Sequence, residues 1–247
     1  MRYFLDISYK GTHYHGWQIQ HNAITVQEVL EKALSTLLRH PVATMGSGRT
    51  DTGVHALQQM VQFDTPRQLS HKNILNLNGI LPRDIVVNHI YKVPDHASAR
   101  FDAISRSYEY IIHKKPSPFF LETAYHFPKY LNVEKMRTAS LILRQYEDFQ
   151  CFSKSNTEVE HFLCDIKEVE LAETEDKVVF KITANRFLRG MVRAIVGTLI
   201  DVGTEKIDIQ HFESIIQSKD RKKAGRAAPP EGLFLCKVQY PDFLSVI

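Results

Sequence analysis

Residues 25–38 of the chain, TVQEVLEKALSTLL, predict an amphipathic helix. Thr25 and Glu28 occupy the two positions of a capping box, in which a hydroxyl and a carboxylate satisfy backbone N–H groups that the first turn leaves free. Pro41 follows the end of the pattern. Apolar residues recur at the spacing of one helix face, at Val26, Val29, Leu30, Ala33, Leu34, Leu37 and Leu38. The stretch is therefore expected to bury one face.

Strand-like segments surround this helix in the first half of the chain. Residues 2–10 alternate as a strand does, and further strands are expected at 42–47, 57–64 and 85–93. A second helix is expected at 70–80, because its pattern stops before Pro82. The first half therefore predicts the order β-α-β-β-α-β.

The second half begins near Ser105 and again mixes strands with helices. Strands are expected at 105–114, 160–172, 177–185 and 233–240. Helices are expected from a cap at Asn132 to about Gln145, at 187–202 before a terminating Gly203, and at 208–218. Residues 92–103 mark the best boundary, so we expect an α+β protein with domains at 1–103 and 104–247. A duplicated unit stays open, because no residue-level repeat supports it.

Composition places the chain among globular proteins. Of 247 residues, 43% are hydrophobic and 24% charged, which excludes disordered and collagen-like chains. The net charge of +3 permits an anionic partner without establishing one. Cys151, Cys164 and Cys236 form no C-x-x-C pair and are interpreted as buried thiols in a reducing compartment. No signal peptide and no apolar run of about 20 residues is present, so we expect a soluble cytoplasmic protein without membrane contact.

The glycine-rich stretch 46–56, GSGRTDTGVHA, is the strongest candidate for chemistry. It lacks the Gly-Lys-Ser/Thr of a phosphate-binding P-loop, and Asp51 stands where a dinucleotide fingerprint needs its third glycine. One interpretation is a hairpin turn whose aspartate bonds its own backbone. The other is a carboxylate held on a tight loop two residues from Arg49. A carboxylate beside a guanidinium stays ionised, which suits a nucleophile or general base.

Basic residues concentrate in two places. Arg186, Arg189 and Arg193 are expected to flank and enter the 187–202 helix, with Arg189 and Arg193 on one face. A second cluster comprises Lys219, Arg221, Lys222, Lys223 and Arg226. Such clusters either form a solvated surface or follow a phosphate backbone. Arg193 lies among apolar residues and needs a carboxylate partner, for which Asp51 is a candidate.

Aromatic residues offer a third signal. Tyr108 and Tyr110 share one face of the strand 106–113, where they either pack in the core or stack on a nucleobase. His13 and His15 have the spacing of metal ligands, but no cysteine or carboxylate completes a site, so no metal is expected.

Six ordered motifs along the whole chain resemble the tRNA pseudouridine synthase A family. They are Tyr14-x-Gly16-Trp17-Gln18, Gly48-Arg49-Thr50-Asp51-x-Gly53-Val54-His55-Ala56, Ala99-Arg100-Phe101-x-Ala103, Arg106-x-Tyr108-x-Tyr110, Phe187-Leu188-Arg189-x-Met191-Val192-Arg193 and Pro229-Pro230-Glu231-Gly232-Leu233. The resemblance implies a homodimer of chains with two similar, RRM-like α+β halves, whose antiparallel sheets meet at a central active-site cleft. It also implies conversion of uridine to pseudouridine at positions 38, 39 and 40 of the tRNA anticodon stem-loop, without metal or organic cofactor.

The same resemblance assigns roles to five residues. Asp51 is the catalytic aspartate, Tyr108 packs on the flipped target base, and Arg193 pairs with Asp51. Arg49 binds RNA or helps to move the base, and Leu233 forms a wall of the pocket.

Two other functions stay open on the residues alone. A non-catalytic RNA-binding protein with paired α+β modules would use the same basic and aromatic residues without chemistry at Asp51. An aspartyl phosphotransferase would need Mg²⁺ and further carboxylates, which the sequence does not group around the loop.

Overall fold

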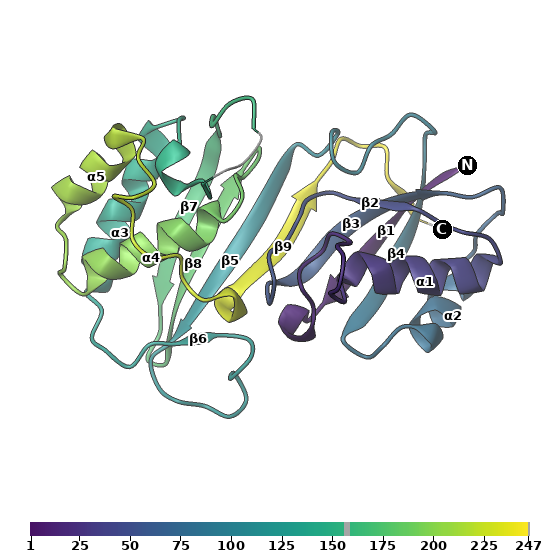
Figure 1. Ribbon diagram of the computed structural model, residues 1–247, viewed down its shortest axis with the longest axis horizontal. Coiled ribbons are helices and arrows are strands. Elements are labelled where there is room, and N and C mark those ends of the chain that lie inside the picture. The colour runs from purple at the N-terminus through teal and green to yellow at the C-terminus, as the bar shows by residue number, and fades with distance from the viewer. Residues whose placement is uncertain (156–158, 247) are drawn as a thin grey trace. The chain divides into compact units, whose positions relative to one another are not determined.

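The computed structural model describes residues 1–155 and 159–246, and the chain folds into two compact units. Unit 1 comprises Met1–Ser105 together with the chain from Phe234 onward, and unit 2 comprises Arg106–Leu233. Unit 2 is therefore continuous in sequence, whereas unit 1 is assembled from both ends of the chain. Figure 1 labels the elements of each unit.

Unit 1 contains a mostly antiparallel sheet with two helices. The strands follow the order β10-β4-β1-β3-β9, and β2 pairs with β3. The single parallel pair among them is β3 with β9, where His55 lies opposite Phe234. The elements are β1 (Arg2–Tyr9), η1 (Gly11–His13), α1 (Val26–Leu38), β2 (Thr44–Gly46), β3 (His55–Asp64), α2 (Lys72–Ile80), β4 (Ile85–Val93), β9 (Leu233–Gln239) and β10 (Ser245–Val246). The predicted β-α-β-β-α-β order is confirmed.

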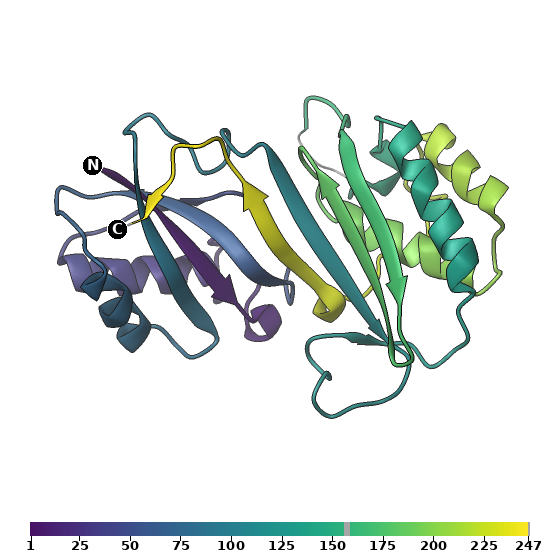
Figure 2. The same ribbon diagram turned by 180° about the vertical axis from the view of Figure 1, so that it is seen from behind.

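The helix α1 forms where the capping pattern predicts it. The Thr25 hydroxyl accepts a hydrogen bond from the Glu28 N–H at 3.3 Å, and Arg39 ends the helix in a left-handed conformation. The apolar face is buried at Val26, Leu30, Ala33, Leu34 and Leu38. Seen from behind, the strands of unit 1 lie in front of both α1 and α2 (Figure 2), so these helices cover one face of the sheet.

The other face of this sheet is partly covered by the C-terminal segment. Phe4 of β1 contacts the Tyr240 and Phe243 rings at centroid distances of 5.6 and 6.2 Å. This segment begins where β9 ends, so β9 and the residues after it complete the core of unit 1.

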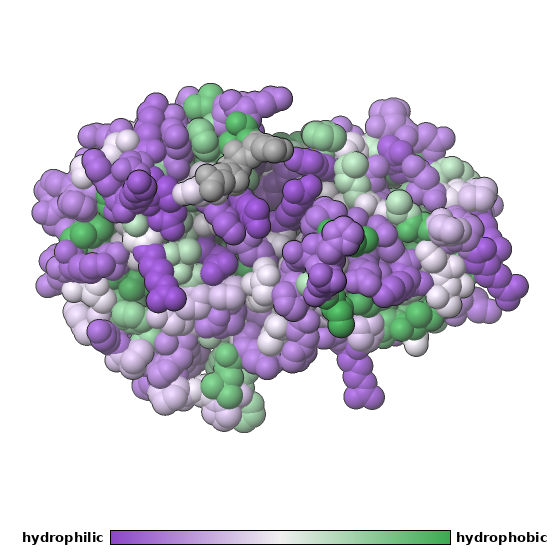
Figure 3. Space-filling model, viewed as in Figure 1, coloured by the Kyte–Doolittle hydropathy of each residue, from purple (hydrophilic) through white to green (hydrophobic). Residues whose placement is uncertain are grey.

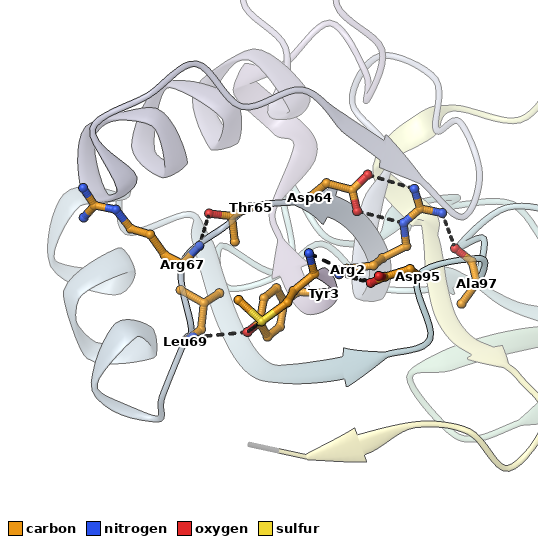
Figure 4. Close-up of polar contacts among 9 residues, drawn as sticks. Arg2, Tyr3, Asp64, Thr65, Arg67, Leu69, Asp95 and Ala97 are labelled. Atoms are coloured by element: carbon orange, nitrogen blue, oxygen red, sulfur yellow. Dashed lines mark hydrogen bonds and ion pairs between the residues drawn. The ribbon is translucent and has the colours of Figure 1, made fainter.

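Arg2 ties three parts of unit 1 together (Figure 4). Its Nε and Nη2 donate to the two carboxylate oxygens of Asp64 at 2.9 and 2.8 Å, and its Nη1 donates to the Ala97 carbonyl at 2.8 Å. The first strand is thereby joined to the end of β3 and to the segment that follows β4.

Unit 2 contains the antiparallel strands β5-β8-β7, which pair in that order, with β6 parallel to β5. Helix α3 packs on β7 and α4, and α5 packs on α3 and α4. The elements are β5 (Ser105–His113), β6 (Tyr125–His126), α3 (Val133–Ile142), η2 (Leu143–Gln145), η3 (Gln150–Phe152), β7 (Ile166–Glu173), β8 (Lys177–Ala184), α4 (Met191–Gly203), α5 (Ile209–Ser218) and η4 (Pro230–Gly232). Because α4 is buried on nearly all sides, it forms the centre of this unit.

Three predicted boundaries in unit 2 are wrong. Helix α4 begins at Met191 instead of 187, because Gly190 adopts φ +71° and stops the helix from extending backward. Arg186 and Arg189 therefore precede the helix, and Arg189 does not share a helix face with Arg193. Gly203 is the last helical residue rather than a C′ glycine. Strand β7 begins at Ile166, later than the predicted residue 160.

All three cysteines lie in the described part of the chain, and none is in a disulfide. Burial raises the pKa of the Cys151 thiol to about 12 and that of Cys164 to about 11. Cys236 is only half-buried, which corrects the expectation that all three are buried. The two buried thiols are therefore poor nucleophiles at neutral pH.

Candidate active site

The predicted catalytic aspartate stands on the loop between β2 and β3. Asp51 is half-buried, Arg49 is exposed, and both belong to unit 1. The Asp51 carbonyl accepts the Val54 N–H at 3.1 Å, which closes a turn, and Gly53 within it has φ +78°. The backbone therefore turns at Asp51 through its main-chain carbonyl, and the side-chain bond of the alternative interpretation stays a prediction.

Aromatic residues from the preceding elements hold this loop in place. The Tyr9 hydroxyl lies 2.9 Å from the Thr50 hydroxyl. The backbone N–H of Trp17 donates to the Thr50 carbonyl at 3.2 Å. The Tyr9 and Trp17 rings stack at 6.4 Å, and both are buried. Thr50, the residue before the aspartate, is therefore fixed through its side chain and its backbone.

A glycine permits the close contact behind the aspartate. Gly16 has φ +85°, and a Cβ added there would lie 2.5 Å from the Thr50 carbonyl oxygen and 3.1 Å from the Asp51 carbonyl carbon. A side chain at this position would displace the loop. The Tyr14-x-Gly16-Trp17 motif thus acts as the support of the Asp51 loop.

The start of the loop is held by buried polar groups. The Ser47 N–H donates to the Met60 carbonyl at 2.7 Å, and the Ser47 hydroxyl donates to Gln59 at 3.0 Å. The Gln59 amide in turn donates to the Gly48 carbonyl at 2.8 Å. Because Ser47 and Gln59 are both buried, these bonds fix the loop against β3.

In unit 2, Tyr108 lies on β5 and is half-buried. The Phe187 ring meets it edge to face, at a centroid distance of 5.1 Å and an interplanar angle of 86°. Tyr110, two residues along the same strand, is fully buried, and its hydroxyl donates to the Pro229 carbonyl at 2.8 Å. The two tyrosines therefore differ in role: Tyr110 packs in the core, whereas part of Tyr108 is exposed.

Arg193 is fixed to the segment before η4. Its Nε donates to the Ala228 carbonyl at 2.7 Å, and the Ala228 N–H donates to the Arg193 carbonyl at 2.8 Å. Arg193 is half-buried near the start of α4. These bonds anchor the base of the guanidinium and set its position relative to residue 228.

The segment 228–233 links the predicted residues of unit 2. It bonds Arg193 at Ala228 and Tyr110 at Pro229, and it ends at Leu233, which is 6% exposed. A Cβ on Gly232 would lie 2.7 Å from the Tyr110 ring, so only glycine fits there without a shift. The Pro-Pro-Glu-Gly-Leu motif thus sets β5, α4 and Leu233 in one arrangement, a role that the sequence alone did not indicate.

The basic residues of unit 2 are only partly available to a ligand. Lys219 pairs with Asp148 at 2.8 Å, and Arg221 donates to the carbonyls of Ala224 and Gly225. Arg186 lies 3.2 Å from the His161 ring nitrogen. The exposed members are Arg189, Lys219, Lys222, Lys223 and Arg226.

The described ranges, 1–155 and 159–246, lack the features of two other kinds of site. No three or more His, Cys, Asp or Glu side chains gather there in a way that suits a metal ion. None of the helices in these ranges combines the length and apolar character that a membrane span needs.

The predicted site residues are divided between the two units. Asp51 and Arg49 lie in unit 1, whereas Tyr108, Arg193 and Leu233 lie in unit 2. The pairing of Arg193 with Asp51 therefore stays a prediction.

Comparison with known proteins gives a consistent result. The chain matches the model of the family described as tRNA pseudouridine synthase over residues 7–102 and 146–241. The tRNA pseudouridine synthase A of Bacteroides fragilis is 46% identical over 98% of this chain and 97% of its own. Proteins of the same name from Porphyromonas gingivalis and Bacillus subtilis are 45% and 41% identical, over 98% of this chain and 98% and 100% of theirs. The two matched segments are consistent with two similar halves.

Proposed function

The chain belongs to the tRNA pseudouridine synthase family, isomerases that form pseudouridine in tRNA, and we propose that it acts at positions 38, 39 and 40 of the anticodon stem-loop. The reaction breaks the bond between N1 of uracil and C1′ of ribose and joins C5 to C1′, so the hydrogen on C5 leaves as a proton and N1 takes one up. Product and substrate are isomers, so no external oxidant or reductant takes part.

The observation that carries the proposal is the way in which the Asp51 loop is held. Thr50 is fixed by Tyr9 and Trp17, and Gly16 leaves room for the loop. A carboxylate on a preorganised backbone needs no further loss of conformational entropy to reach its reactive position. Asp51 is proposed as the nucleophile or base, and attack on ribose, attack on the base and formation of a glycal all stay open.

The target uridine must leave its stack before Asp51 can reach it. Extruding a base costs on the order of a few kcal/mol, and stacking on an aromatic ring returns about 1–3 kcal/mol. Tyr108 is proposed to provide this ring, because it is half-exposed and its orientation is supported by Phe187. Tyr108→Phe is expected to keep most of the rate and Tyr108→Ala to lose at least about tenfold, measured as pseudouridine formed per minute. Equal rates in the two variants would remove Tyr108 from this role.

Three further residues complete the proposed site. Arg193, anchored at Ala228, is proposed as the counter-ion of Asp51, and Leu233 as a wall of the uridine pocket. Arg49 is exposed beside Asp51, which suits a contact with the RNA. No chemistry of a metal or organic cofactor is part of the proposal.

Domain organisation and assembly are proposed from the family resemblance. Unit 1 has the chain order and the strand order β4-β1-β3-β2 of a β-α-β-β-α-β module, which supports an RRM-like half. The proposed domains are 1–103, with the aspartate loop, and 104–247, with Tyr108 and Arg193; the chain from Phe234 onward belongs to the second domain by sequence and to unit 1 by its contacts. A homodimer is proposed as the working assembly.

The test is tritium release from unmodified tRNA labelled at C5 of uridine. The wild type is expected to release the label in step with pseudouridine formation. Asp51→Asn is expected to abolish release while it keeps tRNA binding, measured by filter retention. Release by Asp51→Asn at the wild-type rate would overturn the role of Asp51, and binding without any release by the wild type would favour a non-catalytic RNA-binding protein.

A further inference from the structure

The segment 94–104, which connects β4 to β5, carries an aromatic ring that the proposed site does not use. Phe101 is 73% exposed, whereas its neighbour Ala99 is fully buried. Single exposed apolar side chains are common on proteins and need no function. Phe101 differs because the backbone beneath it is fixed, so the ring is held out into solvent.

Internal hydrogen bonds close the turn at residues 98–102. The Ser98 N–H donates to the Asp102 carboxylate at 2.8 Å, and the Asp102 N–H donates to the Ser98 carbonyl at 3.1 Å. The Phe101 N–H donates to the Ser98 hydroxyl at 3.3 Å. Each end of the turn therefore holds the other, and the backbone of Phe101 is part of the bonded loop.

Side chains from the core of unit 1 anchor this turn from below. The Ala99 N–H donates to Gln62 of β3 at 2.8 Å, and the Ala99 carbonyl accepts from the Tyr240 hydroxyl. Arg2 donates to the Ala97 carbonyl at 2.8 Å (Figure 4). With these anchors the turn cannot fold down to bury the ring without breaking buried polar bonds, which is costly.

A guanidinium lies over the Phe101 ring. The Arg100 guanidinium carbon lies 5.2 Å from the centroid of the Phe101 ring, within the range of a cation–π contact. An exposed ring and a guanidinium on a fixed turn match what single-stranded nucleic acid offers, because bases stack on rings and phosphates attract cations. A protein partner would more commonly meet several apolar side chains together.

We propose that Phe101 and Arg100 form a second contact point for tRNA, at which an unpaired base other than the target uridine stacks on the Phe101 ring. The inference rests on the proposed function, because tRNA is taken as the ligand.

The turn lies far from the Asp51 loop along β3. Gln62, which anchors the turn, is seven residues from His55, the first residue of the strand after that loop. Seven steps of a strand span about 23 Å. The contact therefore serves binding of the tRNA and not the bond changes at the uridine.

The first test is the steady-state rate of tritium release by Phe101→Ala. The expected result is a KM for tRNA raised at least about fivefold with an unchanged kcat, because the stacked base is lost and the reacting groups are not touched. Phe101→Trp is expected to restore the wild-type KM. A KM for Phe101→Ala equal to that of the wild type would overturn the inference, as would a fall in kcat alone.

A matched control is available in unit 2. Phe119 is 87% exposed on the loop between β5 and β6, over which apolar side chains gather (Figure 3). Phe119→Ala removes an equal ring from the surface and is expected to leave KM unchanged. If both variants raised KM by the same factor, the loss would reflect a general effect of exposed rings, and the assignment to Phe101 would fail.

A second measurement needs no turnover. Trp17 is the only tryptophan of the chain and is 1% exposed, so the indole of F101W is the only exposed one. Its fluorescence is expected to be quenched as unmodified tRNA is added, with a midpoint near the KM. Unchanged emission at saturating tRNA would overturn the inference. Absence of tritium release by the wild type would instead count against the proposed function, so the two failures are distinguishable.

Discussion

Asp51 owes its position to residues that carry no chemistry of their own. Tyr9, Trp17 and Gly16 come from β1 and from the segment before α1, and together they fix Thr50. Their contribution is steric and directional, because they set where the loop backbone runs. The consequence is that a change without any charge can impair the reaction.

Gly16→Ala tests this directly. The added Cβ would lie 2.5 Å from the Thr50 carbonyl oxygen at a backbone φ of +85°, so the loop must move. A displacement of about 1 Å can cost on the order of 100-fold in rate, so kcat for pseudouridine formation is expected to fall at least about tenfold. Gly48→Ala is the control from the same loop, because a Cβ there meets nothing within 4 Å. Equal losses of kcat in both variants would contradict this account.

At the level of single residues, sequence identified the loop and could not identify its supports. The motif around Asp51 stands out because glycines cluster beside a charged pair. The roles of Ala228 and Gly232 depend on contacts with Arg193 and Tyr110, which are 35 and more than 100 positions away. No local pattern of residue types encodes such contacts.

Among the elements, α4 shows how a backbone contact can determine a residue. A Cβ on Gly197 would lie 1.8 Å from the Arg226 carbonyl oxygen, which is backbone and cannot swing away. Gly197→Ala is therefore expected to lower the free energy of unfolding by at least about 2 kcal/mol in urea denaturation. Gly79→Ala in α2, where a Cβ meets nothing within 4 Å, is expected to raise it by about 0.5–1 kcal/mol. If both variants lost stability, the loss in Gly197→Ala could not be assigned to the contact with Arg226.

The ion pair between β1 and β3 predicts a pH dependence. The Arg2 guanidinium donates to Asp64 and lowers the pKa of that carboxyl below its usual range. The pair therefore stabilises the fold above the ordinary pKa of aspartate and loses its effect as pH falls through the lowered value. Because Asp64 is largely exposed, the effect is at most about 1 kcal/mol.

The measurement is the free energy of unfolding of the wild type and of Asp64→Asn between about pH 7 and pH 2. The two curves are expected to differ at neutral pH and to converge in acid. Asp242→Asn, at an exposed position, is the control and is expected to follow the wild type. A difference that grew toward acid would have the wrong sign for this pair.

Sequence located most elements of both units and misplaced some of their ends. The start of α4 was placed too early because Phe187 and Leu188 continue its apolar spacing, and only the φ of Gly190 shows that the helix begins after them. Gly203 was expected to terminate the helix in a left-handed conformation, but Glu205 adopts that conformation instead, with φ +59°. Periodicity marks the faces of helices well, whereas their ends depend on single dihedral angles.

For the molecule as a whole, the distribution of charge matters more than the net charge of +3. Neutralising one phosphate changes the slope of log affinity against log salt by about 0.7–0.9. Binding of tRNA is therefore expected to weaken steeply with salt, and Lys222→Gln with Lys223→Gln to reduce that slope by about one to two. Lys72→Gln with Lys92→Gln, two exposed lysines of unit 1, is the control. A nearly flat salt response in the wild type would exclude the Lys219–Arg226 cluster as an RNA surface.

The assembly of unit 1 from both ends of the chain was beyond what sequence indicates. Strand β9 has the pattern of an ordinary strand at the end of the second half, and its parallel pairing with β3 joins residues about 180 positions apart. Pairings of this kind are set by the packing of the finished fold, so no local signal precedes them.

The return of β9 to unit 1 has a consequence for biosynthesis. A ribosome delivers residues 106–233 before it delivers the strand and the aromatic residues that complete the earlier half. Unit 2 can therefore complete its fold before unit 1 does. Until β9 is made, the edge of β3 at His55, next to the aspartate loop, stays unpaired. Truncated chains released before Phe234 would lack that strand and would expose a pairing edge to aggregation.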